Sequence, residues 1–213
     1  RKDRLRLNIN TYYMLYNEQL VLTGDLDDVG SPIRTNSGSS YRMGIEAEAR
    51  IKLSEFFLMN TNVTLSSNKN KQTLSKFDGK IVDFGKTNIS FSPDFIASNT
   101  IVFSPKDNLD ISFLSKYVGK QYMGNIDAVN SILDSYFVND LNLNYKINPK
   151  KTFKEIIISG LINNILDKEY VSNGYYYTYD DTWSVPGQTK TMDGAGYYPQ
   201  ATRNFLIGIT LKF

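Results

Sequence analysis

The stretch from Tyr41 to Leu53 alternates apolar and polar side chains over its whole length. Its even positions are Arg42, Gly44, Glu46, Glu48, Arg50 and Lys52. A β-strand sorts such a pattern onto two faces, whereas a helix with 3.6 residues per turn would scatter the charges around its axis. Strands in soluble sheets are usually about 5 or 6 residues long. The length of this stretch therefore favours a strand that crosses a membrane.

The charged side chains of this strand fix its register. A slip by one residue would turn all of them toward lipid, where an Arg or Lys at the middle of a bilayer costs roughly 2–4 kcal/mol. We therefore expect them to face the polar interior of a barrel as a charge ladder on one wall. The ladder consists of Arg42, Glu46, Glu48, Arg50 and Lys52.

The end of the chain, from Arg203 to Phe213, repeats the same alternation. One face carries Phe205, Ile207, Ile209, Leu211 and Phe213, and the other carries Asn204, Gly208, Thr210 and Lys212. A terminal amphipathic strand that ends in an aromatic residue is typical of outer-membrane barrels. The ring of Phe213 is expected to anchor at the inner interface, and it resembles the signal that the barrel assembly machinery reads.

The same period predicts eight strands. They are Arg4–Tyr16, Tyr41–Leu53, Phe56–Ser67, Phe95–Ser104, Leu109–Tyr122, Tyr136–Ile147, Lys154–Asn163 and Arg203–Phe213. The connections between them are 17–40, 54–55, 68–94, 105–108, 123–135, 148–153 and 164–202, so long and short ones alternate strictly. Outer-membrane barrels have short periplasmic turns and long extracellular loops. The sequence predicts an all-β fold, an antiparallel transmembrane β-barrel segment with that arrangement.

Two segments depart from the pattern. Ile156, Ile157 and Ile158 are apolar on both faces, and Asn139 falls on the otherwise apolar face of its strand. Contacts with a plug or with a partner surface would explain them, and so would a wrong register.

Composition narrows the possible functions. No run of about 18 apolar residues is present and the mean hydropathy is −0.35, which excludes a helical membrane protein. The net charge is +2 and the basic residues are dispersed, so the sequence has no basic patch of the kind that binds nucleic acid. The chain has no Cys and no His, so it cannot form a disulfide or a Ser-His nucleophile pair. We expect no catalytic residue, metal site or cofactor. Fifteen Tyr, 12 Phe and one Trp suit the aromatic girdles of a barrel.

Four segments resemble motifs of TonB-dependent outer-membrane receptors, particularly those of Bacteroidetes-like bacteria. They are NSGSSYRMGIE at 36–46, KYVGKQY at 116–122, NILDKEY at 164–170 and YPQATRNF at 198–205, followed by the final Phe213. In the third motif Ile165 and Leu166 replace the usual Leu-Phe. Each motif is weak alone, but their order and spacing make the set fairly specific.

The resemblance implies that residues 1–213 are the C-terminal portion of a larger receptor barrel. Complete members have 22 strands, an N-terminal plug and a short box that binds TonB, and neither plug nor box is visible in this chain. A self-contained eight-stranded barrel, with side chains filling its narrow lumen, is the alternative.

The resemblance also implies a function at the outer membrane of a Gram-negative bacterium. That function is active import of a scarce nutrient, with a ferric siderophore or other iron chelate favoured over an oligosaccharide or cobalamin. The implied partners are outer-membrane lipid, TonB acting through the plug, the barrel assembly machinery and a small-molecule or chelate ligand. An adhesin or a structural channel of eight strands is an alternative of another class.

The last long connection carries the candidate ligand-binding residues. They are Tyr175, Tyr176, Tyr177, Tyr179, Trp183 and Tyr197. Tyr and Trp offer a flat apolar face with a polar handle, which suits sugars, aromatic chelates and protein partners. The same residues would equally form an outer aromatic girdle or pack the connection on itself.

Overall fold

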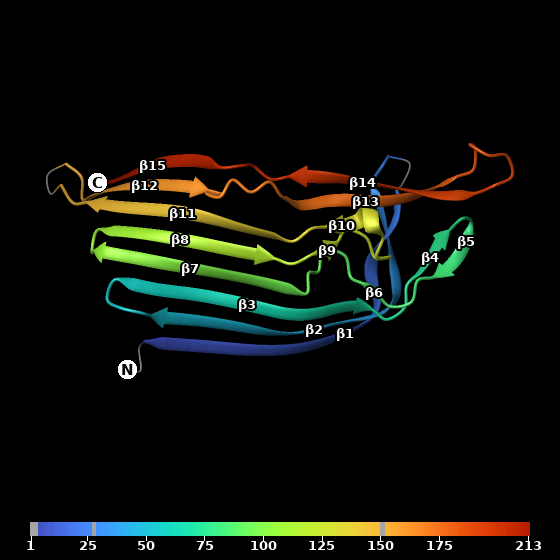
Figure 1. The fold of residues 1–213 in the computed structure, drawn as a ribbon, viewed down its shortest axis with the longest axis horizontal. Helices are drawn as coiled ribbons and strands as arrows, with labels where there is room; N and C mark the ends of the chain where they lie inside the picture. The colour runs from blue at the N-terminus through green and yellow to red at the C-terminus, as the bar shows by residue number, and fades with distance from the viewer. Residues whose placement is uncertain (1–3, 27–28, 150–151) are drawn as a thin grey trace.

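The computed structural model describes residues 4–26, 29–149 and 152–213 and shows one large antiparallel sheet (Figure 1). Its eight long strands pair in chain order. They are β1 (Leu5–Leu26), β2 (Pro32–Lys52), β3 (Phe57–Asn70), β7 (Phe95–Lys106), β8 (Leu109–Val118), β11 (Tyr136–Ile147), β12 (Glu155–Asn163) and β15 (Asn204–Lys212). All eight predicted strands are present, and the all-β antiparallel fold is confirmed.

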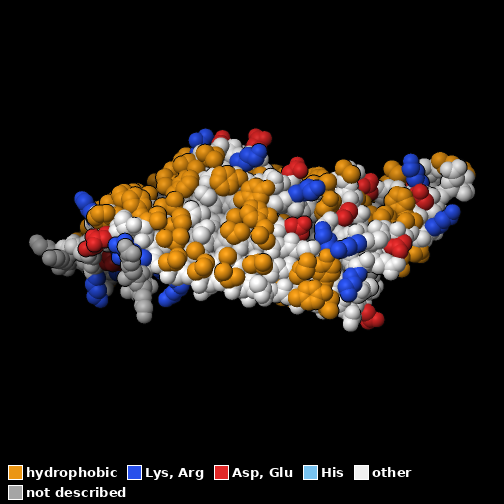
Figure 2. All heavy atoms as spheres, turned by 60° about the horizontal axis from the view of Figure 1, so that its bottom comes forward, with side chains coloured by type: hydrophobic (Ala, Val, Ile, Leu, Met, Phe, Trp, Pro, Cys, Tyr) orange, Lys and Arg blue, Asp and Glu red, His pale blue; other side chains and the backbone are white. Residues whose placement is uncertain are grey.

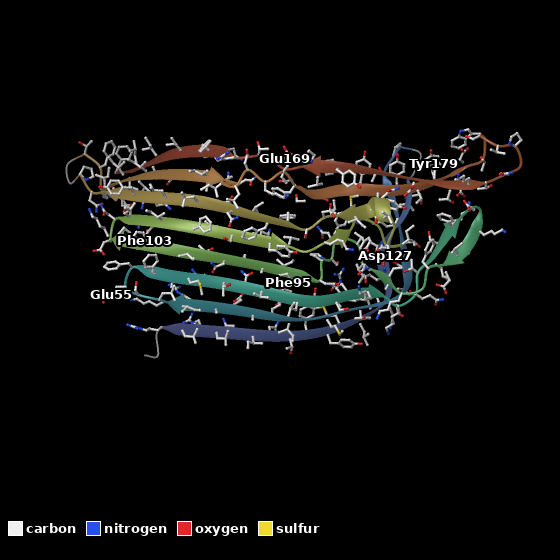
Figure 3. All side chains as sticks on the ribbon, viewed as in Figure 1. Glu55, Phe95, Phe103, Asp127, Glu169 and Tyr179 are labelled. Carbon is white, nitrogen blue, oxygen red and sulfur yellow. The ribbon has the colours of Figure 1, made fainter. Side chains whose placement is uncertain are left out.

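Short turns and long connections lie at opposite ends of the sheet. Figure 1 shows the start of β1, the end of β15 and the β2–β3 and β7–β8 turns at one end, the turn end, and the connection that carries β13 and β14 at the opposite, loop end. In Figure 3 Glu55 and Phe103 lie at the turn end, whereas Tyr179 lies at the loop end. Only Asp107 and Asn108 separate β7 from β8. The predicted alternation of connection lengths is confirmed from β2 onward, whereas the first predicted long connection is largely taken up by β1 and β2.

The long connections hold more regular structure than the sequence predicts. β1 and β2 continue through most of 17–40, where Gln19 pairs with Ser37. The predicted strand Leu109–Tyr122 is wrong beyond Val118, where β8 ends. The further short elements are β4 (Leu74–Phe77), β5 (Lys80–Asp83), β6 (Thr87–Asn88), β9 (Gln121–Tyr122), the 3-10 helix η1 (Val129–Ser131), β10 (Ile132–Leu133), β13 (Val171–Asp181) and β14 (Lys190–Pro199). Backbone pairing needs no apolar face, so a search for apolar alternation misses such strands.

The cross-strand register carries one apolar face over the sheet. Ile9 lies opposite Ala47, Ala47 opposite Val63, and Val63 opposite Ala97. Directly opposite residues share a face, so the apolar rows of successive strands are continuous. We call this side of the sheet the apolar face and the other side the polar face.

The protein itself leaves the apolar face uncovered. Ile9 is 65% exposed and Ile207 is 83% exposed. Within the described residues, the buried hydrophobic side chains are Ile89, Val118, Met123, Leu133 and Val138. Figure 2 shows hydrophobic side chains spread over the strand region, with most charged side chains toward its ends. A surface of this size needs an apolar environment, as the predicted membrane-spanning sheet would have. No helix in the described part of the chain is long and apolar enough to cross a membrane.

The register accounts for the two irregular segments differently. Ile156 and Ile158 pair with residues of the apolar face, whereas Ile157, opposite Lys146 and Thr210, lies on the polar face. Asn139 does lie on the apolar face, opposite Ser115, whose hydroxyl donates to Asn139 Oδ1 at 2.7 Å. The side chain is buried, with 2% of it exposed, and its Nδ2 has no hydrogen-bond partner.

The loop end draws together the two edges of the sheet. β13 and β14 form a separate two-stranded sheet that lies between β12 and β15 in the chain, at the far edge from β1, yet the loop end of β1 lies beside β13 (Figure 1). The β13–β14 hairpin therefore does not project freely, because it contacts a strand from the far edge.

Candidate functional site

The β13–β14 hairpin presents one aromatic face outward. Side chains alternate along β13, so Tyr175, Tyr177 and Tyr179 share a face. Their rings stack in sequence, with centroids 6.2 Å apart for the first pair and 6.4 Å for the second, and Trp183 continues the stack 6.0 Å beyond Tyr179. Tyr198 of β14 lies 6.0 Å from Tyr175. We call these five side chains the aromatic row.

Glycines on β14 make room for the aromatic row. Tyr175 pairs with Gly196, and Tyr177 pairs with Gly194. A Cβ at Gly196 would lie 2.3 Å from the ring of Tyr175, and one at Gly194 would lie 2.6 Å from the ring of Tyr177. The rings of Tyr175 and Tyr177 therefore lie across the backbone of β14, in close contact with the paired glycines. Four rings of the row are exposed to solvent: Tyr175 at 49%, Tyr179 at 43%, Trp183 at 69% and Tyr198 at 52%.

The opposite face of the hairpin anchors it to the rest of the loop end. The ring of Tyr176 lies against Gly124, and its hydroxyl donates to Asp193 Oδ2 at 3.4 Å. Burial, followed by the nearby Asp193 carboxylate, raises the pKa of Tyr176, which keeps the phenol protonated. The Tyr197 hydroxyl donates to the carbonyl of Asn130 at 2.9 Å. Four of the six predicted residues thus lie in the aromatic row, and Tyr176 and Tyr197 lie on the anchoring face.

A pocket opens beside the aromatic row, where three hairpins meet. Its volume is about 530 Å³. Its lining residues are Ile33, Lys76, Tyr177, Thr178, Tyr179, Asp180 and Thr191. It combines two ring edges with hydroxyl, carboxylate and ammonium groups, which is the mixture of apolar wall and a few polar groups that small-molecule sites use.

One wall of the pocket is held by a clasp between β4–β5 and β13–β14. Lys76 Nζ lies 2.6 Å from Asp180 Oδ2, and the Thr191 hydroxyl donates to Asp180 Oδ1 at 2.9 Å. Thr191 N donates to Asp78 Oδ1 at 2.7 Å, and Asp78 N donates to Thr191 Oγ1 at 2.6 Å. We call these four residues the hairpin clasp. It joins segments that are far apart in the sequence.

The hairpin clasp is expected to be insensitive to mild acid. The hydrogen bond from Lys76, and then that from Thr191, lower the pKa of Asp180 below its ordinary value of 3.8. A lowered folded-state pKa means that the carboxylate's contribution is complete above the ordinary pKa and is lost as pH falls through the lowered one. Hydrogen exchange of the β4–β5 amides should stay flat between about pH 8 and pH 5, after correction for the intrinsic rate.

The variant Asp180→Asn should speed that exchange at neutral pH, because it removes the ion pair with Lys76. Asp134→Asn, at an exposed acid outside the clasp, serves as the matched control. Equal exchange in both variants would show that the clasp does not hold the hairpin.

The five residues of the predicted charge ladder on β2 share the polar face, as predicted. Glu46 lies opposite Asn10 and Thr64, and Asn10 Nδ2 donates to Glu46 Oε2 at 3.3 Å. Arg42 Nη1 donates to Ser92 Oγ at 2.9 Å. Among the described residues, no two members of the set form an ion pair. Their cross-strand neighbours are mostly residues with amide and hydroxyl groups. The charged side chains of this set therefore have hydrogen-bonding groups beside them rather than ion-pair partners.

The segment 164–168 forms a structural clasp at the rim between β11, β12 and β15, a role that sequence reasoning missed. Asn164 is 4% exposed and has φ of 51°. Its Nδ2 donates to the carbonyls of Lys168 at 2.8 Å and Ala201 at 3.3 Å, and its Oδ1 accepts from Lys168 N at 2.9 Å. Asp167 Oδ1 accepts from Arg203 N at 2.8 Å. We call these five residues the rim clasp. In the sequence it is marked by the Asn-x-x-Asp spacing of residues 164–167, and asparagine is one of the residues that tolerate a positive φ.

Comparison with known proteins identifies the fold family. The model of the family described as "TonB dependent receptor-like, beta-barrel" matches residues 1–165. The chain belongs to this family. No curated protein is similar enough in sequence to be matched to it. TonB-dependent receptors are outer-membrane transporters of Gram-negative bacteria, not enzymes.

Solved structures of TonB-dependent receptors share the fold. The ferric-catecholate import receptor Fiu of E. coli K12 is 16% identical, with a TM-score of 0.64 over 100% of this chain and 26% of its own. The siderophore receptor PiuA of Acinetobacter baumannii is 16% identical, with a TM-score of 0.65 over 98% of this chain and 26% of its own. The copper transporter OprC is 17% identical, with a TM-score of 0.65 over 99% of this chain and 29% of its own. The chain thus spans between a quarter and a third of the length of these receptors.

The predicted terminal aromatic residue can be placed in the structure. Phe213 is 74% exposed, and its ring centroid lies 5.0 Å from that of Phe153 at the turn end. Its role as an assembly signal stays a prediction. Among the residues that the structure describes, no group of three or more carboxylates could hold a metal ion.

Proposed function

We propose that this chain is the C-terminal portion of a TonB-dependent receptor that imports an iron chelate, such as a ferric siderophore, across the outer membrane. The observation that carries the proposal is the pocket beside the aromatic row, at the end of the sheet opposite the short turns. In an outer-membrane barrel that end faces the exterior. Similar folds in receptors for ferric catecholates and siderophores support the choice of ligand.

The proposed assembly divides the work among several parts. The apolar face would contact outer-membrane lipid, and the polar face would line the lumen. TonB would act through an N-terminal plug that residues 1–213 do not supply. The barrel assembly machinery would recognise the strand that ends at Phe213. This chain would then contribute wall and extracellular ligand contacts rather than the moving element.

An oligosaccharide is the second candidate ligand, and the aromatic row favours it. Stacked rings in a line suit the faces of successive sugar units. The cation that lines the pocket, Lys76, is paired with Asp180, so it offers little charge to an anionic chelate.

Uptake by cells that carry the complete receptor as their only route would test the proposal. Radiolabelled ferric chelates should accumulate in a TonB-dependent manner, while labelled oligosaccharides should not. Accumulation of oligosaccharide alone would show that the transported substrate is a sugar rather than an iron chelate. TonB-independent passage of both would overturn active transport and favour a structural channel.

Removing rings from the aromatic row is expected to weaken ligand binding. Tyr177→Ala and Trp183→Ala should each raise the dissociation constant roughly two- to tenfold, since an aromatic pair is worth about 0.5–1.5 kcal/mol. Tyr177→Phe keeps the ring and should bind nearly normally. Val185→Ala removes an exposed apolar side chain near Trp183 and is the matched control. Equal affinity in all four variants would place the ligand elsewhere.

A further inference from the structure

The polar face contains a second hollow, near the turn end of β1, β2, β3 and β7. Its volume is about 300 Å³. The residues that line it are Arg6, Asn8, Glu48, Ala49, Arg50, Asn60, Thr61, Asn62, Ser98 and Thr100. It is separate from the loop-end pocket, with which it shares no residue.

Two arginines lie directly opposite each other in this hollow. Arg6 of β1 pairs with Arg50 of β2, so their Cβ atoms are about 5 Å apart on one face. Like charges at opposed positions are unfavourable. Within the described residues, neither guanidinium forms an ion pair. In this part of the chain neither arginine therefore has a carboxylate within ion-pair distance, and the one acidic residue in the lining is Glu48.

The surroundings of the two arginines are rich in hydrogen-bond donors. Asn60 lies opposite Arg50 on β3, and Asn62 lies one row further along the same face. Asn8 lies beside them on β1. Each guanidinium carries five N–H groups and each amide carries two. Guanidinium groups match the planar or tetrahedral oxygens of carboxylate and phosphate, often in bidentate geometry.

We propose that this hollow binds an anionic group, a carboxylate or a phosphate, between Arg6 and Arg50. The anion would relieve the repulsion between the two arginines and accept from the neighbouring amides. Two sources offer this chemistry: a free anion in the lumen, or an acidic side chain of a protein segment seated against the wall. The proposal does not depend on which nutrient the receptor carries.

Glu48 gives the proposal a test of opposite sign. It lines the same hollow, opposite Asn8 and two positions before Arg50 on the same face. Its carboxylate opposes an incoming anion while the arginines attract it. Glu48→Gln should therefore strengthen anion binding, and Arg6→Gln or Arg50→Gln should weaken it.

The experiment measures the thermal midpoint of the complete receptor, purified in detergent, as inorganic phosphate replaces chloride at constant ionic strength. For a free anion, phosphate should raise the midpoint saturably. Arg6→Gln and Arg50→Gln should each weaken the apparent affinity about tenfold, as expected for a charge-assisted hydrogen bond. Glu48→Gln should strengthen it. Lys106→Gln removes a cation outside the hollow, in the β7–β8 turn region, and should leave the response intact.

A seated acidic side chain predicts a different pattern. Phosphate would then not change the midpoint of the native receptor. Arg6→Gln and Arg50→Gln would lower the midpoint at low salt more than at high salt, and Glu48→Gln would raise it. Arg50→Lys keeps the positive charge at this position, so it distinguishes an effect of weaker anion binding from an effect of impaired folding. The proposal is overturned if Arg6→Gln and Arg50→Gln both behave like Lys106→Gln in midpoint and phosphate response.

Discussion

Replacing Ala47 by arginine is expected to abolish assembly of the barrel in the outer membrane. Ala47 lies near the middle of Tyr41–Leu53, on the apolar face between Ile9 and Val63. An arginine there would meet the centre of the bilayer, at a cost of roughly 2–4 kcal/mol. That cost lowers the equilibrium constant for insertion and folding on the order of 30-fold or more. The measurement is the heat-modifiable folded band of the complete receptor in isolated outer membranes.

The neighbouring position provides the matched control. Glu46→Arg introduces the same side chain one residue away, on the polar face opposite Asn10 and Thr64. It should assemble almost normally, because the new charge would meet water and amides rather than lipid. Equal loss of assembly in both variants would contradict the assignment of the two faces.

Removing the side chain of Asn164 is expected to loosen the rim clasp. Asn164→Ala leaves the carbonyl of Ala201 and both polar backbone groups of Lys168 without their side-chain partners. Each lost hydrogen bond costs about 0.5–1.5 kcal/mol. The alanine must also adopt the positive φ that asparagine tolerates better. We expect the thermal midpoint of the complete receptor to fall by several degrees.

Two further substitutions separate these contributions. Asn164→Gly tolerates the backbone angle but loses the hydrogen bonds, so it should recover only the part that comes from strain. Asn164→Asp keeps the acceptor for Lys168 N and loses both donated bonds. A midpoint for Asn164→Ala equal to that of the native receptor would show that the clasp contributes nothing to stability.

The strands of the apolar face could be predicted from the sequence because lipid imposes period two on them. Ala47 and Glu46 occupy the faces that alternation assigns to them. Beyond the apolar region this constraint disappears. Gln19 and Ser37 pair in the parts of β1 and β2 that lie beyond the predicted strands. The pattern therefore ended the predicted strand at Tyr16, although backbone pairing continues to Leu26.

The candidate site was predicted in composition but not in arrangement. A run such as Tyr175-Tyr176-Tyr177 is aromatic on both faces, so alternation gives no clue that it is a strand. Tyr176 lies on the opposite face of the hairpin from Tyr175 and Tyr177, because β13 pairs with β14 and the ring of Tyr176 contacts Gly124. The partners of the hairpin clasp, Lys76 and Asp180, come from distant connections. Only the folded chain shows that they meet.

The division of the β13–β14 hairpin into an anchoring face and an open face has an evolutionary consequence. Substitutions in the aromatic row change what the surface displays without touching Tyr176, Tyr197 or the membrane strands. Glycines at 194 and 196 limit this freedom only where a ring must lie across them. Under the proposed function, related receptors could diverge in ligand preference through a few outward positions of one hairpin, while the membrane-spanning strands change more slowly.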